Sequence, residues 1–515
     1  MSPVAWSHLR RLLAVLVSRR AASIAALGLA VLLGAVAGST PGEAQRVGLG
    51  EENSWLRIQN VGIQHAEIDI EFFDKEGAAV GRDFCPRDGG CEALPPGFGW
   101  SFFQQGYRPL EAGYRGSASV TVDQPFVALL ARDVFKAGLF QIGGDSLRLS
   151  VGSQAQYAPI VQNTAEYVSR LSVANLSDEH AACFQILYYD EGATEPIVDP
   201  PGRTAGCSSG GWLVGPRGTL LRDEHDLPVP MGFDGSAVIV AVRTSSGVEA
   251  DEQLPSLMVD TRERDGPGLA TYRAFDGLEL SHEIVLPLVD RNASEGRTTW
   301  TTRFRIFNSV PGNDNEVELL FTGQDDTGAE IEIEHSVQVA STLTCDQRLD
   351  GAGGCLPDDV SLPDVFFGSV RARSVHPIAI VAQRLSRDGA LADYRGFTAE
   401  EAARELMLPV LNKNFGPWGD FNGWNSWFRV ATFDGSEGSM HVMYFSKQFP
   451  NGLLSRLIPL DGQRTVRQWE EGRLPDGWVG SGIIIADRPV VAVANLESDV
   501  FEGDPVMLYN GVSLK

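Results

Sequence analysis

The chain has 515 residues, of which 43% are hydrophobic and 21% are charged, with 56 glycines and a formal net charge of −25. This composition is that of a globular protein, which argues against a largely disordered chain, and the length exceeds what one hydrophobic core usually covers. The strong negative charge would repel nucleic acid and anionic lipid headgroups, so we expect neither as a partner.

Residues 1–45 have the pattern of an export signal. Four arginines between positions 10 and 20 precede the apolar run AASIAALGLAVLLGAVA (21–37), and Ala35 and Ala37 provide the small side chains that signal peptidase requires. The alternative is an uncleaved membrane anchor, because a run of this length lies near the lower limit for spanning a bilayer. We therefore expect an extracellular or cell-surface protein that contacts the membrane only through this segment, if the segment remains uncleaved.

The rest of the chain repeats one strand pattern four times. Each copy has two apolar positions separated by one residue, and this period of two is typical of a half-buried strand. The apolar pairs are Leu56 and Ile58, Leu171 and Val173, Phe304 and Ile306, and Phe428 and Val430. The residues between them, expected on the outer face, are Arg57, Ser172, Arg305 and Arg429. An asparagine ends the strand in three copies, at positions 60, 175 and 308, where its side chain can hydrogen-bond a turn.

Two further strand signals follow in every copy. A second strand, at 66–77, 182–192, 315–328 and 438–452, closes on a glycine suited to a hairpin turn. An aromatic-x-Gly-Ser motif then opens an apolar run, and in three copies a proline follows nine residues after the glycine, at Pro125, Pro377 and Pro489. We expect this run and the next to form a closing hairpin, with the proline at an edge or turn. The second copy has Thr244 at this position, so the layout of its last strand stays open.

These signals predict an all-β chain of four tandem antiparallel β-sandwiches of the immunoglobulin-like type behind the export segment. The repeats are too long for propeller blades or solenoid units. We expect an export segment at 1–45 and sandwiches at 46–152, 153–280, 281–397 and 398–515. A short linker helix is expected at 398–406, where Thr398 and Glu401 have capping-box spacing. The four sandwiches are expected to follow one another like beads.

Six cysteines in an exported chain predict three local disulfides, Cys85–Cys91, Cys183–Cys207 and Cys345–Cys355. Metal binding is the competing interpretation, but CxxC spacing is absent and no histidine lies beside any pair. We expect these bonds to fasten loops rather than to hold the fold together.

The turn asparagines, the strand that ends in YYDEG and the Gly-Ser motif before the closing strands resemble those of exported bacterial proteins built from tandem immunoglobulin-like or fibronectin-like modules. The resemblance covers most of residues 46–515 and lies at the level of the module. It implies a stalk, spacer, adhesin or carbohydrate-binding role, with other surface proteins or glycans as partners.

A run rich in aromatic residues opens the fourth copy. Trp418, Phe421 and Trp424 lie in the loop before the repeated strand, and Trp427 falls on the outer face of that strand. Together with nearby asparagines, these rings could stack on a sugar and bind its hydroxyl groups. The competing interpretation is that the loop packs onto its own module or onto the third. Carbohydrate recognition by the fourth module is therefore the alternative function.

No catalytic set converges in the sequence. GCSSG (206–210) matches the nucleophile-elbow pattern, but that motif needs a strand-to-helix turn in a parallel sheet, and we expect Cys207 to be in a disulfide. The histidines are scattered, so we expect no metal site and no cofactor, with calcium at the acidic turns 313–316 and 324–328 left open. We expect a non-enzymatic surface or matrix protein whose four modules form a semi-rigid rod for spacing, adhesion or assembly. A secreted hydrolase is the least favoured class.

Overall fold

The computed structural model describes residues 51–515 except 88–90, 105–106, 108, 112, 137, 148–152, 203, 297 and 417–422, so the predicted export segment lies outside it. The described residues form β-strands joined by turns, and the helical segments among them are short 3₁₀ turns: η2 (Ala250–Glu252), η3 (Gly277–Glu279), η4 (Gly351–Gly354) and η5 (Gln468–Glu470). No helix in this part of the chain is long and apolar enough to cross a membrane. The all-β class predicted from the sequence is confirmed.

The strands group into four units, named here modules 1 to 4, which follow one another along the chain. Module 1 (51–147) contains β1 (Glu51–Asn60), β2 (Ile68–Asp74), β3 (Ala79–Cys85), β4 (Gly99–Phe103), β5 (Gly116–Val122), β6 (Phe126–Lys136) and β7 (Leu139–Leu147). Module 2 (155–279) contains β8 (Ala155–Asn163), β9 (Tyr167–Asn175), β10 (Ala182–Asp190), β11 (Ile197–Asp199), β12 (Trp212–Val214), β13 (Thr219–Arg222), β14 (Phe233–Val242), β15 (Pro255–Glu263), β16 (Leu269–Arg273) and β17 (Phe275–Asp276).

Modules 3 and 4 follow the same plan. Module 3 (281–398) contains β18 (Ser281–Arg291), β19 (Ala293–Glu295), β20 (Thr298–Asn308), β21 (Asn315–Gln324), β22 (Glu330–Val339), β23 (Thr342–Asp346), β24 (Phe366–Ser386), β25 (Leu391–Arg395) and β26 (Phe397–Thr398). Module 4 (403–513) contains β27 (Ala403–Lys413), β28 (Trp424–Thr432), β29 (Gly438–Phe445), β30 (Leu453–Leu454), β31 (Ile458–Leu460), β32 (Gln463–Arg467), β33 (Trp478–Ser498), β34 (Gly503–Asp504), β35 (Val506–Asn510) and β36 (Val512–Ser513).

Each module has two layers of antiparallel strands in a shared order. In module 3 the first layer runs β22–β21–β24–β18–β26 and the second runs β23–β20–β24–β25. Module 2 repeats these orders as β11–β10–β14–β8–β17 and β13–β9–β15–β16. Module 4 repeats them as β29–β33–β27–β36 and β32–β28–β33–β35. Module 1 has β3–β2–β5 and β4–β1–β6–β7.

In modules 3 and 4 the two apolar runs after the Gly-Ser motif form one strand, β24 or β33, that passes between layers, and in module 1 they form β5 and β6, which pair in different layers. The predicted closing hairpin is therefore wrong. In module 3, residues 366–374 of β24 pair with β21 and β18, while residues 378–386 pair with β20 and β25. Pro377 lies between these halves, where its missing N–H breaks no ladder bond, and its carbonyl accepts from the N–H of Ser309 (3.1 Å). A proline between two apolar runs fits a hairpin and a crossing equally well, because both remove the proline from the ladder.

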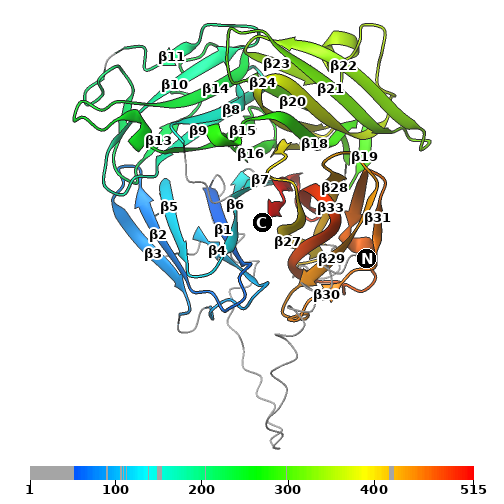
Figure 1. The fold of residues 1–515 in the computed structure, drawn as a ribbon. Helices are drawn as coiled ribbons and strands as arrows, with labels where there is room; N and C mark the ends of the chain where they lie inside the picture. The colour runs from blue at the N-terminus through cyan, green and yellow to red at the C-terminus, as the bar shows by residue number, and fades with distance from the viewer. Residues whose placement is uncertain are drawn as a thin grey trace, which may run out of the picture.

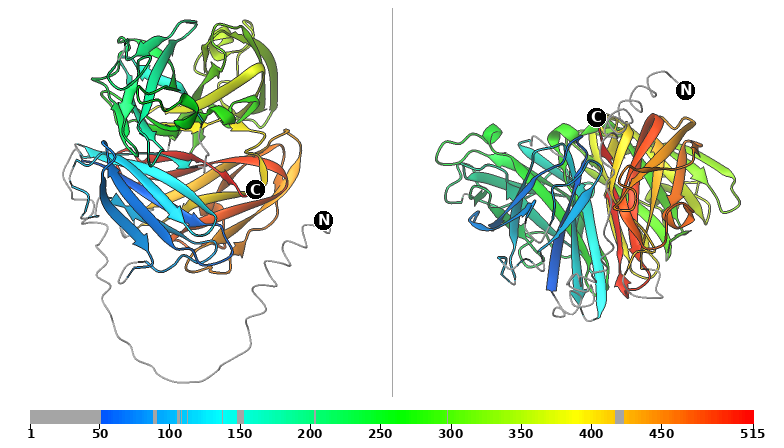
Figure 2. Two further views of the ribbon diagram at one scale, coloured as in Figure 1. Left: turned by 60° about the vertical axis from the view of Figure 1, so that its left-hand side comes forward. Right: turned by 90° about the horizontal axis from the view of Figure 1, so that it is seen from below.

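The modules do not form the predicted rod, because module 1 packs against module 4 and closes a ring. Gly503 and Asp504 of β34 pair in parallel with Phe140 and Gln141 of β7. Figure 1 shows modules 2 and 3 (green to yellow) side by side above modules 1 (blue) and 4 (orange), and Figure 2 keeps module 1 against module 4 in both views. One buried apolar cluster combines Leu129 and Ile142 of module 1 with residues of module 4 that include Leu408 and Met507. Cores that continue across module boundaries oppose the independent movement expected of beads.

The last strand of each second layer lies at the centre of the ring. These strands are β7, β16, β25 and β35, and each packs on its counterparts in both neighbouring modules. In modules 2 to 4 a tyrosine of this strand donates its hydroxyl to a carbonyl of the first strand of the same module: Tyr272 to Ile160 (2.6 Å), Tyr394 to Leu288 (2.6 Å), and Tyr509 to Val410. In module 1 the residue at this position is Asp145, which lies opposite Leu130 as Tyr394 lies opposite Ala382.

The asparagines predicted to turn the chain do so through their side chains. Nδ2 of Asn308 donates to the carbonyl oxygens of Asn313 (2.7 Å) and Val339 (3.1 Å), and its Oδ1 accepts from the N–H of Val310 (3.2 Å). Asn60 and Asn175 make bonds of the same kinds in their own modules.

The linker helix predicted at 398–406 is a turn between two strands. Thr398 ends β26, and β27 begins at Ala403. Glu401 Oε2 accepts from the N–H of Thr398 (3.0 Å), so the hydrogen bond that the capping-box spacing anticipates is made without a helix behind it. The prediction failed because this local bond also closes a turn, and pairing of β27 with β33 then determines the backbone.

The structure contains the three predicted cysteine pairs, Cys85–Cys91, Cys183–Cys207 and Cys345–Cys355. Each bond closes a loop inside one module, and none of the three crosses a joint. The ring is therefore held by packing and polar contacts rather than by covalent links.

Candidate functional site

The aromatic run of module 4 packs at joints between modules. Trp427 is fully buried in an apolar cluster that it shares with Trp300 and Val289 of module 3. Trp424 is half-buried, with its ring centroid 5.9 Å from that of Phe140 in module 1. Trp427 does point away from the core of its own module, as predicted, but the neighbouring module covers that face. The ring of Trp427 is therefore not free to stack on a sugar.

The two remaining aromatic candidates, Trp418 and Phe421, lie outside the described residues.

The polar column between the apolar pairs contacts the preceding module of the ring in the same way. Arg57 of module 1 donates from Nε to the carbonyl of Pro409 in module 4 (3.0 Å). Arg429 of module 4 is buried, which lowers its pKa, while the nearby carboxylates of Asp290 and Glu295 in module 3 act in the opposite direction. The polar positions between the apolar pairs, which the sequence predicts to face water, therefore lie at the joints between modules.

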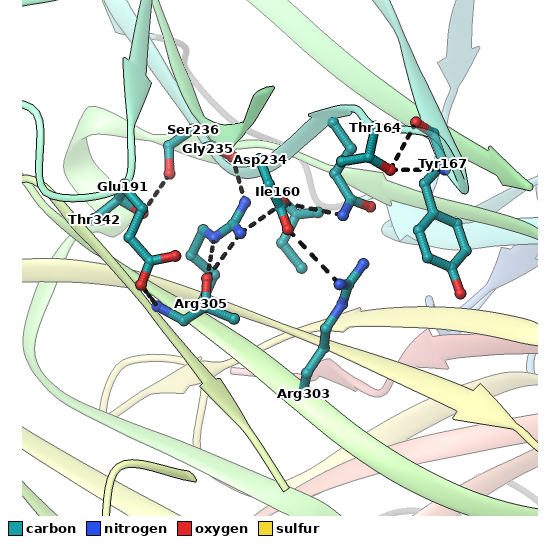
Figure 3. Close-up of polar contacts among 12 residues, drawn as sticks. Ile160, Thr164, Tyr167, Glu191, Asp234, Gly235, Ser236, Arg303, Arg305 and Thr342 are labelled. Atoms are coloured by element: carbon teal, nitrogen blue, oxygen red, sulfur yellow. Dashed lines mark hydrogen bonds and ion pairs between the residues drawn. The ribbon is translucent and has the colours of Figure 1, made fainter. Parts of the chain in front are cut away.

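Figure 3 shows the joint between modules 2 and 3, where Asp234 lies between two arginines. Its carboxylate is 2.6 Å from Nη2 of Arg305 and 3.8 Å from Nη1 of Arg303. Burial by itself would raise the pKa of Asp234, but the charges of Arg305 and Arg303 outweigh burial and hold the pKa below its usual value. Beside this group, Oγ of Ser236 contacts Oγ1 of Thr342 (2.8 Å). Charge-assisted bonds thus hold this joint.

Ionisable side chains also gather at the centre of the ring. Arg273 and Arg395 both bind Glu279, at 2.6 and 3.3 Å. Burial opposes ionisation of Glu279, but the two guanidinium groups bring its pKa down to about 2. Asp393 is also buried, and here burial outweighs the nearby positive charge of Arg303 and raises the pKa to about 7. The hollow at this centre measures about 20 Å³, which holds about one water molecule, so these groups join strands rather than bind a ligand.

A hollow of about 920 Å³ opens between modules 1 and 2. Its walls are the turn between β2 and β3, residues 109–111 and 113–115, and residues 219–221, 223 and 226 of module 2. The charged side chains in the lining are Asp74, Glu76, Glu111, Asp223 and Asp226 against Lys75 and Arg115. Both cations are paired, Lys75 with Glu76 (3.4 Å) and Arg115 with Asp223 (4.0 Å). The excess of carboxylates favours a cationic group over an anionic one.

Beside this hollow, the first layer of module 1 lacks, among the described residues, the first strand and the short closing strand that the other three modules have. In modules 2, 3 and 4 the strand that follows the Gly-Ser motif pairs on both sides, with β10 and β8, with β21 and β18, and with β29 and β27. Its counterpart in module 1 is β5, which among the described residues pairs with β2 alone. Tyr114 and Arg115, which line the hollow, directly precede β5. The hollow and the open edge form one continuous candidate site on module 1.

The sequence pattern did not point to this site. The signal that could have found it is the segment before β1, because STPGEAQRVGLG (39–50) lacks the continuous apolar run of β8, β18 and β27. Aligning the repeats on their shared columns hides this difference, since the columns begin only at β1.

The remaining motifs make structural contacts. Cys207 of the GCSSG run is in a disulfide, and Oγ of Ser208 donates to the carbonyl of Arg243 (2.7 Å), so this serine is held in a loop between antiparallel strands. In the acidic turn 324–328, Asp325 accepts from the N–H groups of Thr327 and Ala329 (both 2.9 Å). Within the described residues, no group of three or more His, Cys, Asp or Glu side chains is placed to hold a metal ion.

Comparison with known proteins gives little. No protein family matches the chain, and no curated protein sequence matches it. Among solved structures, the crystal structure of a tetra-tandem repeat in the extending region of a large adhesion protein overlaps 90% of this chain and 100% of that chain, at 10% identity and a TM-score of 0.09. A TM-score this low carries no argument, so the function is argued from the residues of this chain.

Proposed function

We propose that this chain is an exported, non-enzymatic surface or extracellular-matrix protein for adhesion or assembly, built of four immunoglobulin-like modules locked into a ring. The observation that carries the proposal is the use of the polar columns. Arg57 and Arg305 each donate a hydrogen bond to the preceding module, and Arg429 lies near two of its carboxylates. Faces that a free sandwich would expose to water therefore hold the modules together. A spacer has no need of such closure, whereas a platform that holds a binding surface in place does.

Two further properties support this proposal. Disulfides within loops are typical of proteins in oxidising compartments, which agrees with an export signal. The described lining of the large hollow carries carboxylates but no histidine, serine or cysteine that would make a nucleophile and base pair. The partners proposed are other surface proteins, and the proposal requires no cofactor or metal.

We do not place Trp427 in a carbohydrate site of module 4, because its ring is buried against module 3.

The location can be tested by breaking the apolar run of the export segment. We expect the unaltered chain in the extracellular or surface fraction of the producing cells, and we expect a Leu29→Arg, Leu32→Arg double variant to remain inside, as measured by immunoblots of cell fractions. N-terminal sequencing of the exported chain would then define the cleavage site. An unaltered chain that stays in the cytosol would contradict the proposal.

The role can be tested by deleting the coding sequence and measuring attachment of the cells to surfaces and to one another. We expect attachment to fall and to recover when the wild-type chain is restored, while the export-deficient variant gives no recovery. Unchanged attachment in the deletion strain would contradict a role in adhesion or assembly.

A further inference from the structure

The open edge of module 1 exposes the inside of its first layer. In the pairing of β2 with β5, Phe72 lies opposite Ala118 and Ile70 lies opposite Val120, and directly opposite residues share a face. Because Phe72 and Ile70 belong to the buried core, Ala118 and Val120 also face inward. Ala118 is nevertheless exposed and Val120 is only half-buried.

The counterparts of these residues are covered. At the position of Ala118, module 2 has Ala237 and module 3 has Val370, and at the position of Val120 module 4 has Ile484; all three are 0% exposed. In each of these modules the strand that covers them is the first strand, β8, β18 or β27. Among the described residues, module 1 has no strand at this place beside β5, which we call the vacancy.

The backbone of β5 also presents hydrogen-bonding groups to this vacancy. The N–H of Asp123 donates to the carbonyl of Glu67 (3.3 Å), so this pair exchanges bonds with β2. In the alternation of an antiparallel ladder, Thr121 and Ser119 do the same, and the N–H and C=O groups of Ala118 and Val120 point to the open side. These are the groups that an added strand would pair.

Natural sheets usually protect such an edge with charge, proline or cover. The outer edge strand of module 3, β22, follows this rule, with the exposed residues Glu330, Glu332 and Glu334 at alternate positions. The sequence of β5 is GSASVTV, with no charged residue and no proline. The edge of β5 is suited to pairing rather than guarded against it.

The three first strands show what fits the vacancy. Their sequences are AQYAPIVQN, SHEIVLPLVDR and ARELMLPVLNK, with buried aliphatic residues around a central proline. Each runs antiparallel to its partner, so its C-terminal end lies where β5 begins; in β18 and β27 this end is Arg291 and Lys413. In module 1 the same place adjoins the acidic hollow, which would favour a basic residue there.

We propose that the β5 edge of module 1 accepts an extended segment of another polypeptide as the missing first strand. The segment has buried aliphatic residues around its centre and a basic residue at its C-terminal end, next to the hollow. This inference rests on the proposed role in assembly and names the chemistry of the partner. Residues 39–50 of the chain itself, with three glycines, one proline and only Val47 and Leu49 as aliphatic residues, do not have this pattern.

The probe for the experiment is a synthetic peptide with the sequence of β27, ARELMLPVLNK, and a scrambled peptide is its control. We expect saturable binding of the peptide to the purified full chain, measured by fluorescence anisotropy. Ala118→Pro removes an N–H that faces the vacancy and places a ring in the path of the strand, so we expect affinity to fall at least about tenfold. Ala118→Val is the matched variant, since it keeps the N–H and introduces the residue that module 3 has, and we expect it to retain binding.

Hydrogen exchange gives a second readout that does not depend on a variant folding normally. In the free wild-type chain we expect the amides of Ala118 and Val120 to exchange fast and to become protected when the peptide binds. The amides of Val370 and Ile484 should be protected in both states, because their edges are already paired.

Three results would overturn the inference. The first is amides of Ala118 and Val120 that are protected in the monomeric chain alone, which would mean that the chain fills its own vacancy. The second is a concentration-dependent dimer that Ala118→Pro abolishes, which would make a second copy the occupant. The third is equal affinity for the scrambled peptide. None of these results affects cell fractionation or attachment, so failure here is distinguishable from failure of the proposed function.

Discussion

Modules 1 and 3 lie on opposite sides of the ring and differ at equivalent positions. Module 3 has Tyr394 bonded to its first strand, where module 1 has Asp145. At an equivalent position of the second layer, module 3 has Arg384 with 0% side-chain exposure, whereas the arginine of module 1, Arg132, is 21% exposed. Equivalent residues are therefore buried in one module and within reach of water in the other.

The repeat therefore determines which residues lie at the joints, while the burial of each joint determines how much its contacts stabilise the protein. Arg384 is enclosed by the rings of Trp300 and Trp427, at 4.5 and 5.4 Å, and pairs with buried Asp290. Arg132 is itself partly exposed and binds two carboxylates, Glu52, which is 24% exposed and shared with arginines of module 2, and Asp260, which is 1% exposed. Water access decides how much an ion pair contributes, because a buried charge that loses its partner cannot be solvated.

Removing the arginine from each module in turn tests whether burial determines how much the arginine stabilises the protein. Arg384→Ala leaves Asp290 buried without its partner, so we expect a loss of about 3–5 kcal/mol in the free energy of unfolding. Arg132→Ala should cost less, about 1–3 kcal/mol, because Glu52 is within reach of water and Asp260, although buried, keeps its hydrogen bond from Oγ1 of Thr271 (2.8 Å). Urea unfolding followed by tryptophan fluorescence would measure both.

A double variant, Arg384→Met with Asp290→Leu, is the control for this pair. Replacing a buried ion pair by apolar residues of similar volume is often close to neutral, so most of the lost stability should return. Equal losses for Arg384→Ala and Arg132→Ala would contradict the role assigned to burial.

The second prediction concerns Asp393 in module 3, whose counterpart in module 1 is Gly144. Burial raises the pKa of Asp393 to about 7, against a hydrogen bond from Gln383 and the charge of Arg303, while the charge of Asp145 adds to the rise. The unfolded chain ionises this group near its ordinary pKa of 3.8, so stability falls as the pH rises from about 4 to about 7 and is constant above. Three pKa units correspond to on the order of 4 kcal/mol.

Asp393→Asn removes this titration, so the variant should gain stability over the wild type at pH 8 and differ little from it at pH 4. Urea midpoints at several pH values would check this. A difference between the two chains that does not change with pH would show that Asp393 is not the group responsible.

Much of this architecture could be predicted from sequence, because the columns that define it are local. The apolar pairs, the turn asparagines and the cysteine spacing each depend on residues a few positions apart, and the structure has them as expected. The all-β class follows from the same alternation.

The ring could not be predicted, because alternation separates a module's core face from its other face without saying what covers the other face. Arg305 suggests water and Trp427 suggests a ligand, yet a neighbouring module covers both. The open edge of β5 was missed for a related reason. A missing strand has no sequence pattern of its own, so it is recognised only when module 1 is compared with the other three modules.

The third prediction uses salt to separate the joints. Glu52 of module 1 accepts from Arg170 and Arg262, both at 2.7 Å, and its side chain is 24% exposed. Glu52→Gln should cost about 1–2 kcal/mol at low ionic strength, and the cost should shrink in 0.5 M NaCl because exposed charges are screened. The loss caused by Arg384→Ala should change little with salt. Unfolding at two salt concentrations would measure both, and equal salt dependence would contradict the contrast between the joints.

The smallest expected effect compares two valines on equivalent strands of the first layer. Val370 on β24 is 0% exposed, so Val370→Ala should cost about 2 kcal/mol through lost packing and the cavity it leaves. Val120 on β5 faces the vacancy, so Val120→Ala should cost below about 1 kcal/mol in the free chain. Adding the β27 peptide should widen the difference between wild type and Val120→Ala, because the added strand buries this side chain. Equal costs for the two valines in the free chain would mean that the inner face of β5 is already covered, and modules 1 and 3 would then be alike in their first layers.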